Sequence, residues 1–169
     1  MKKRVLFSAL VLALFSLISF SQNGKKFFKA GNELMENLKY DDAIVQYTNA
    51  IGVEPSNAEY YSARGSANES AGKLKEAYSD FEKAIVFQPK DVNEIINLGR
   101  ICNRLGKFDE ALSHLNRATN MDKRNVRVYP EKVKTLIGLE RYDQALRASD
   151  TSILIRDDPS HYYYRGIIF

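Results

Sequence analysis

The chain has 169 residues, of which 44% are hydrophobic and 27% charged, a balance typical of one folded domain with a sizeable core. This composition excludes an intrinsically disordered chain, which would carry far fewer apolar residues. The formal net charge of +4 by itself would favour an anionic partner, such as nucleic acid or a membrane surface.

The first 21 residues predict a secretory signal peptide. Lys2, Lys3 and Arg4 precede an apolar run over residues 5–20, and small residues suit cleavage after Ser21. The run has 16 residues, fewer than the roughly 20 of a membrane span. An uncleaved anchor is the alternative, and the lack of a cysteine after the run argues against a lipoprotein. We expect an exported protein, periplasmic or secreted, without a membrane span after signal removal.

Loss of the signal peptide would change the charge of the chain. Removing Lys2, Lys3 and Arg4 from the 25 basic residues leaves 22 against 21 acidic residues, a net charge of +1. Nucleic-acid binding depends mainly on a positive surface that neutralises phosphates. We therefore expect no nucleic-acid partner.

The rest of the chain, residues 22–169, repeats one pattern every 34 residues. Alanines recur at this interval, each three residues after a large apolar residue, which places both on one helix face. Glycines recur at the same interval on a preceding helix, although glycine there costs about 1 kcal/mol relative to alanine. We predict that they allow close contact between paired helices. The recurring residues are Ala43, Ala77, Ala111 and Ala145, with Gly31, Gly65 and Gly99 before the first three.

Two prolines and the single cysteine also fall at informative positions of the repeats. Pro55 and Pro89 predict the ends of the second helices in the first two units, because proline cannot continue a helix interior. Cys102 is the only cysteine, so the chain cannot form an intramolecular disulfide. It falls on an inward-facing helix position, and we expect it to be buried.

This pattern resembles the tetratricopeptide repeat family, whose 34-residue motif has glycine at position 8, alanine at 20 and 27, an aromatic residue at 4 and 24, and proline at 32. The resemblance implies an all-α fold, a right-handed superhelix of stacked antiparallel helical hairpins. It implies four repeats and the first helix of a fifth: 24–57, 58–91, 92–125, 126–158 and the partial repeat 159–169.

The fourth and fifth repeats depart from the motif. Val133 stands in place of the glycine and Ser149 in place of the second aromatic residue, and Pro130 is tolerable only in the first turn of its helix. The chain stops inside the first helix of the fifth repeat. That half-repeat is either an end cap or the start of further repeats; we favour a fragment of a longer exported protein, because terminal repeats are usually polar.

The chain offers few residues for catalysis. A nucleophilic pair of Cys102 and His114 would need hydrogen-bond contact and an oxyanion site. His161 is the only other histidine, and no spacing typical of a metal site or a phosphate loop is present. We expect no enzyme activity, no cofactor and no metal.

In the family that the chain resembles, the first helices of the hairpins line a concave groove. Carried over, this implies a groove that binds a protein or peptide segment. Because arginines and asparagines fall on its lining positions, our hypothesis is that the ligand carries carboxylates, with arginines pairing to the carboxylates and asparagines holding the peptide backbone. The alternative is that these residues form a solvated helix face. The family's clamp for C-terminal carboxylates is not reproduced, since Glu131 stands where a cation is expected. The candidate residues are Asn93, Asn97, Arg100, Arg104, Arg127 and Lys134.

Three classes of function follow in order. The first is an exported scaffold or adaptor that mediates protein–protein interaction. The second is a non-catalytic repeat segment of a larger envelope protein, whose catalytic or wall-binding domain is missing here. A self-contained enzyme comes last, because the chain offers few residues for catalysis. The partner stays unnamed, because one fold supports many unrelated interactions.

Overall fold

A computed structural model of the protein describes residues 23–156, 162–163 and 165–166. The expected signal peptide, His161 and the last three residues lie outside this range. Every regular element of the described residues is helical. They are a helix over residues 23–36, α2 (Tyr40–Val53), α3 (Ala58–Ser70), α4 (Leu74–Phe87), α5 (Val92–Arg104), α6 (Phe108–Met121), α7 (Val128–Gly138) and α8 (Tyr142–Ile155).

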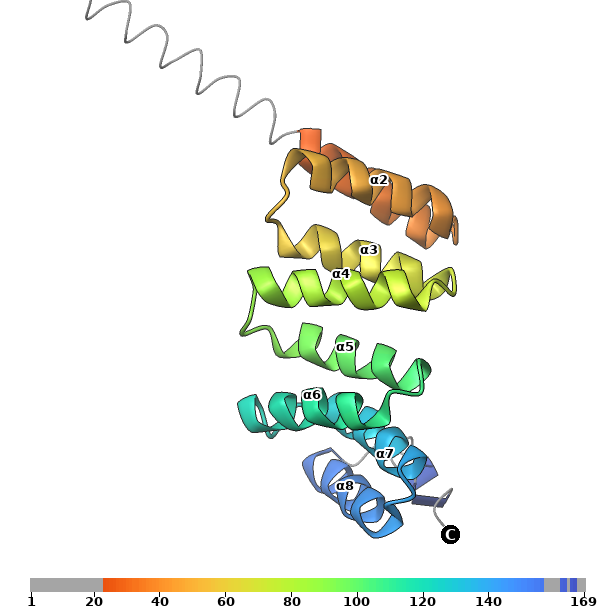
Figure 1. The fold of residues 1–169 in the computed structure, drawn as a ribbon, viewed down its shortest axis with the longest axis vertical. Coiled ribbons are helices and arrows are strands. Elements are labelled where there is room, and N and C mark those ends of the chain that lie inside the picture. Colours follow the sequence, from red (N-terminus) through yellow and green to blue (C-terminus); the bar gives the residue numbers. More distant parts are fainter. Residues whose placement is uncertain (1–22, 157–161, 164, 167–169) are drawn as a thin grey trace, which may run out of the picture.

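The helices pair into hairpins that stack in chain order. The helix over residues 23–36 pairs with α2, and α3 with α4, α5 with α6, and α7 with α8 follow along the long axis of the molecule (Figure 1). Residues 162–163 and 165–166 are also helical, after α8, where the first helix of a fifth repeat is expected. The predicted all-α solenoid of stacked hairpins is confirmed.

The hairpins begin close to the expected repeat boundaries. Asn57 and Asp91 cap α3 and α5, accepting backbone N–H bonds from Glu59 at 3.1 Å and Asn93 at 2.8 Å, so these helices begin at positions 58 and 92. α7 begins at Val128, two residues after the position expected for the fourth repeat. Its Pro130 lies in the first turn, where the missing N–H costs no helical hydrogen bond.

The turn inside each hairpin has the same backbone geometry. One residue in each turn has a positive φ. The backbone N–H of the residue after it donates a hydrogen bond to the carbonyl five residues earlier; the N–H of Lys73, for example, donates to the carbonyl of Asn68 at 2.8 Å. This arrangement satisfies the last carbonyls of the first helix. The second helices α2 and α4 end two residues before Pro55 and Pro89, as predicted. The positive-φ residues are Leu38, Gly72, Gly106 and Glu140.

The recurring alanines form the centre of the core. Ala43, Ala77, Ala111 and Ala145 are all fully buried, which confirms the face predicted from their spacing. Around them, buried clusters of side chains link each hairpin to the next. The core is therefore continuous along the stack, and no hairpin has to bury its apolar face alone.

The recurring glycines allow the closest helix contacts. A Cβ on Gly31 would lie 2.5 Å from the ring of Tyr47, and one on Gly99 would lie 2.8 Å from Leu115. The corresponding distance from Gly65 to the Phe81 ring is 3.2 Å. These contacts confirm that the glycines admit a large side chain from the partner helix.

The fourth hairpin keeps its packing with a different pair of residues. Val133 replaces the glycine and is buried, and Ser149 replaces the large side chain and is also buried. The larger residue thus moves to the first helix and the smaller one to the second. Such an exchange conserves the volume that the hairpin must fill.

Candidate functional site

Neighbouring first helices share a polar surface, which we call the first-helix face: the polar residues of α3, α5 and α7 that bond one another, with Arg127 just before α7. Ser62 of α3 donates a hydrogen bond to Glu94 of α5 at 2.7 Å. Arg127 donates to the Oδ1 of Asn93 at 2.8 Å, across an interval of 34 residues. These bonds place polar side chains from successive repeats on one surface.

A buried carboxylate lies at the centre of this face. Glu69 of α3 is 10% exposed, and Arg104 of α5 pairs with its Oε1 through Nη1 at 3.0 Å. Arg100, one helical turn earlier, forms an ion pair with the same oxygen and also donates to Asn97 Oδ1 at 3.2 Å. Two arginines that share one carboxylate offset the cost of removing its charge from water.

A second buried carboxylate belongs to the next first helix. Glu131 of α7 pairs with Lys134 at 2.8 Å, one turn further along the same helix. Asn103 of α5 donates to the backbone carbonyl of Glu131 at 3.0 Å and accepts from Thr135 at 2.7 Å. These bonds join α5 to α7 and fix the orientation of both helices.

The structure brings the six candidate residues into one neighbourhood but changes their charge balance. Four lie on α5, and Arg127 and Lys134 lie on or next to α7. Glu69 and Glu131 neutralise part of the positive charge, so the first-helix face carries charges of both signs. No local sequence pattern predicts the pairing with Glu69, which lies 31 and 35 residues from its two arginines.

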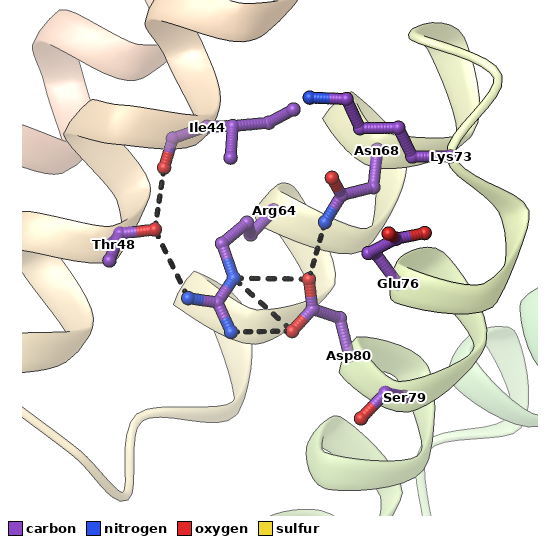
Figure 2. Close-up of a pocket in the computed structure, with 8 residues that line it drawn as sticks. All are labelled: Ile44, Thr48, Arg64, Asn68, Lys73, Glu76, Ser79 and Asp80. Atoms are coloured by element: carbon purple, nitrogen blue, oxygen red, sulfur yellow. Dashed lines mark hydrogen bonds and ion pairs between the residues drawn. The ribbon is translucent and has the colours of Figure 1, made fainter.

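The opposite side of α3 contributes to a pocket of about 450 Å³ between α2 and α4 (Figure 2). Asp80 is buried there and accepts from Arg64 at 2.7 Å and 3.0 Å and from Asn68 at 2.8 Å. Arg64 also donates to Thr48 of α2 at 3.1 Å. Because Arg64 binds Asp80 within its own repeat and Thr48 of the preceding repeat, we interpret this network as a link between repeats.

One repeat later, three potential ligands gather in a related position. The Sγ of Cys102, a carboxylate oxygen of Glu110 and a ring nitrogen of His114 all lie within 4.8 Å of one another. We call these residues the Cys–Glu–His cluster. The sequence singled out Cys102 and His114 only as a possible nucleophilic pair. It did not predict a three-ligand cluster, because Cys102 is on α5 and the other two residues are on α6. The i, i+4 spacing of Glu110 and His114 was the only signal present.

Burial sets the protonation of this cluster. Cys102 is fully buried, as predicted, and this burial raises the pKa of its thiol to about 12. Burial also lowers the pKa of His114, so its ring is neutral near neutral pH. The hydroxyl of Tyr78 donates to Glu110 and lowers the pKa of that carboxyl. A thiol that is rarely ionised is not an activated nucleophile, even with His114 close by.

None of the described helices combines the length and the apolar character that crossing a membrane requires.

The chain matches two family models, both described as tetratricopeptide repeat, over residues 28–92 and 95–125. It is similar to small glutamine-rich tetratricopeptide repeat-containing protein 2 of Saccharomyces cerevisiae, with 34% identity over 119 residues. The alignment covers 66% of this chain and 34% of the yeast protein, so the chain spans about a third of that relative's length.

Two solved structures resemble the stack of hairpins. MamA from Desulfovibrio magneticus RS-1 has a TM-score of 0.80 at 14% identity, covering 86% of this chain and 83% of its own, which shows the fold alone. The first TPR of Spaghetti (RPAP3), bound to the HSP90 peptide SRMEEVD, has a TM-score of 0.68 at 26% identity. That match covers 71% of this chain and 95% of the other.

Proposed function

Because this chain belongs to the tetratricopeptide repeat family, we propose that it is an exported protein-interaction scaffold whose first-helix face binds an extended acidic peptide segment. The observation that carries the proposal is the convergence of Arg100 and Arg104 on the carboxylate of Glu69. Two arginines already directed at one carboxylate can receive another from a ligand.

The ligand would compete with Glu69 for the arginines. A carboxylate of the peptide takes over hydrogen bonds from Arg100 or Arg104, both of which keep part of their side chain in solvent. The amides of Asn93 and Asn97 are placed along the same helix to bond the backbone of an extended peptide. Arg127 provides a further cation at the N-terminal end of α7.

A known complex supports this class of ligand. The HSP90 peptide bound by the first TPR of RPAP3, SRMEEVD, carries three acidic residues. Peptide binding by a relative of this fold favours a scaffold over a catalytic role here. The high pKa of the Cys102 thiol also argues against nucleophilic catalysis.

Export rests on the N-terminal sequence. Three cations followed by a 16-residue apolar run and small residues are typical of a cleaved signal peptide. If cleavage follows Ser21, the protein recovered from its cells should begin at Gln22. An intact N-terminus on the recovered protein would contradict cleavage.

The binding proposal predicts opposite effects for the two sides of the central ion pair. Replacing both arginines, Arg100→Gln with Arg104→Gln, should weaken binding of SRMEEVD at least 10-fold, because each charge-assisted bond contributes about 1.5–3 kcal/mol. Glu69→Gln should strengthen binding, since it releases both arginines from their internal partner. Fluorescence anisotropy with the labelled peptide measures both changes.

Matched controls separate this effect from general charge. Arg117→Gln removes an exposed arginine of α6, a second helix, and should leave affinity unchanged. The peptide SRMQQVN, which keeps the arginine but has no acidic side chain, should bind more weakly than SRMEEVD to the unaltered protein. Equal binding of the two peptides, or weaker binding by Glu69→Gln, would contradict an acidic ligand on this face.

A further inference from the structure

The Cys–Glu–His cluster combines three kinds of metal ligand at one point in the stack. Cys102 comes from α5, and Glu110 and His114 come from successive turns of α6. A thiol, a carboxylate and an imidazole within 4.8 Å of one another are a donor set found around divalent transition metals. We propose that these three residues bind one divalent metal ion of the zinc class.

The geometry is close to that of a bound ion. Zinc bonds of about 2.0–2.3 Å place tetrahedral donors roughly 3.3–3.8 Å apart, so donors within 4.8 Å of one another need to approach by about 1.5 Å at most. Cys102 is fully buried and held by the core, whereas Glu110 and His114 are only half-buried. Small rotations of the two α6 side chains are therefore enough to close the site.

Comparison with the preceding repeat explains why the site arises here. In that repeat, 34 residues earlier, Asn68, Glu76 and Asp80 hold the same three positions. Its buried carboxylate, Asp80, is neutralised by Arg64. In the third repeat, Leu98 stands in place of Arg64, so this position supplies no positive charge to the Cys–Glu–His cluster. A metal ion would supply the positive charge that the arginine supplies one repeat earlier.

The surroundings orient the ligands. Tyr78 of α4 donates its hydroxyl proton to Oε1 of Glu110, the oxygen that also faces Nε2 of His114 at 4.0 Å. Such outer hydrogen bonds fix the carboxylate of a metal site. Lys107 pairs with the other oxygen at 3.1 Å but is 48% exposed, so it can turn into solvent when an ion binds.

The mixed donors decide the class of ion. Thiolate and imidazole favour zinc, cobalt, nickel or copper over calcium and magnesium, which prefer oxygen ligands. The negative charge of Glu82 on α4 also acts on Cys102 and His114 and favours a cation between them. Three protein ligands leave the fourth tetrahedral position to water.

Cobalt is a suitable probe because a cobalt–thiolate bond absorbs light and zinc does not. Binding of the ion displaces the thiol proton of Cys102 to solvent. We therefore expect Co²⁺ added to the reduced protein to produce a thiolate-to-cobalt charge-transfer band that saturates at one ion per chain. Zn²⁺ should displace the cobalt and remove the band. The absence of the band at saturating Co²⁺ would overturn the proposal.

Variants identify the ligands. Cys102→Ser should abolish the band, and His114→Ala should weaken Co²⁺ binding at least 10-fold. Tyr78→Phe, which removes only the outer hydrogen bond, should weaken binding by about 10–100-fold. Glu76 is the residue of the preceding repeat that corresponds to Glu110. Glu76→Gln therefore serves as the matched control, and we expect it to leave the affinity for Co²⁺ unchanged.

Folding is checked by the helical circular-dichroism signal of each variant. Cys102 is part of the core, so its variant could be poorly folded, but His114 is half-buried and its alanine variant keeps the test valid. Unchanged Co²⁺ affinity in a folded His114→Ala protein would refute the site. None of these residues belongs to the first-helix face, so peptide binding and metal binding can fail separately.

Discussion

At Gly31, Gly65 and Gly99, a hydrogen atom in place of a side chain sets the distance between two helices. The space that each glycine leaves is filled by one large residue from the second helix of its hairpin, so the intrinsic cost of a mid-helix glycine is offset by packing. The three contacts differ in tightness. That difference gives a graded prediction.

Gly31→Ala and Gly99→Ala should each destabilise the protein by about 1–2 kcal/mol. Overpacking costs roughly 1–3 kcal/mol, and alanine's better helix propensity returns up to about 1 kcal/mol. Gly65→Ala should be near neutral, because its new Cβ would lie 3.2 Å from the Phe81 ring, compared with 2.5 Å and 2.8 Å at the other sites. Urea unfolding followed by circular dichroism measures these changes.

Gly52 provides the control for that series. It is a glycine in α2 with no heavy atom within 4 Å of the added Cβ, so Gly52→Ala should leave stability unchanged or raise it by up to about 1 kcal/mol. Equal losses at Gly31 and Gly52 would show that packing against Tyr47 is not the cause.

The first helices are elements with two functional sides. On α5, Arg100 and Arg104 belong to the first-helix face, and Cys102 points into the core beside α6. On α3, Glu69 belongs to that face and Arg64 to the pocket between α2 and α4. The helix period separates residues that are adjacent in sequence, so one helix can serve two different sites.

The hairpin turns carry the clearest prediction for an element. Two of the four use glycine at the positive-φ position, whereas Leu38 and Glu140 adopt φ of 58°. A non-glycine residue costs about 1–2 kcal/mol in that conformation, and glycine's extra freedom in the unfolded chain costs about 0.5–1 kcal/mol. Leu38→Gly and Glu140→Gly should each raise the free energy of unfolding by about 0.5–1 kcal/mol in urea titrations.

The reverse change tests the same reasoning. Gly106→Ala places a Cβ at φ of 73°, with open space around it, so any loss of stability comes from the backbone and not from a clash. A stable Gly106→Ala protein, or destabilised Leu38→Gly and Glu140→Gly proteins, would disprove the role assigned to this position.

For the whole molecule, each hairpin contacts mainly its neighbours along the stack. One buried cluster joins α5, α6, α7 and α8, and another joins the helix over residues 23–36 to α2 and α3. The stability of such an array is close to a sum of repeat and interface contributions. Local damage should therefore spread only a short distance.

Leu115→Ala tests this at the centre of the stack. Leu115 is fully buried in the cluster of α5–α8, and its truncation should cost about 2–5 kcal/mol. Hydrogen–deuterium exchange read by mass spectrometry should show faster exchange in α5–α8 and little change over residues 23–53. A uniform increase over all described helices would indicate a single cooperative unit instead.

The sequence by itself determined the hairpins, their period and the buried face. Alanine and glycine spacings repeat every 34 residues, and local helix geometry converts such spacings directly into faces. The positions of Pro55 and Pro89 likewise fixed the ends of α2 and α4. The sequence also singled out the residues of α5 and α7 that belong to the first-helix face.

Only the tertiary structure decided which side chains meet between helices. Glu69 pairs with two arginines, and Cys102 meets Glu110 and His114, because of the way the helices stack. No local sequence pattern predicts the distance between side chains on different helices. Periodicity assigns a residue to a face, but the partner on the facing helix is set by packing in three dimensions. The charge balance of the first-helix face and the assembly of the Cys–Glu–His cluster were therefore decided by the fold.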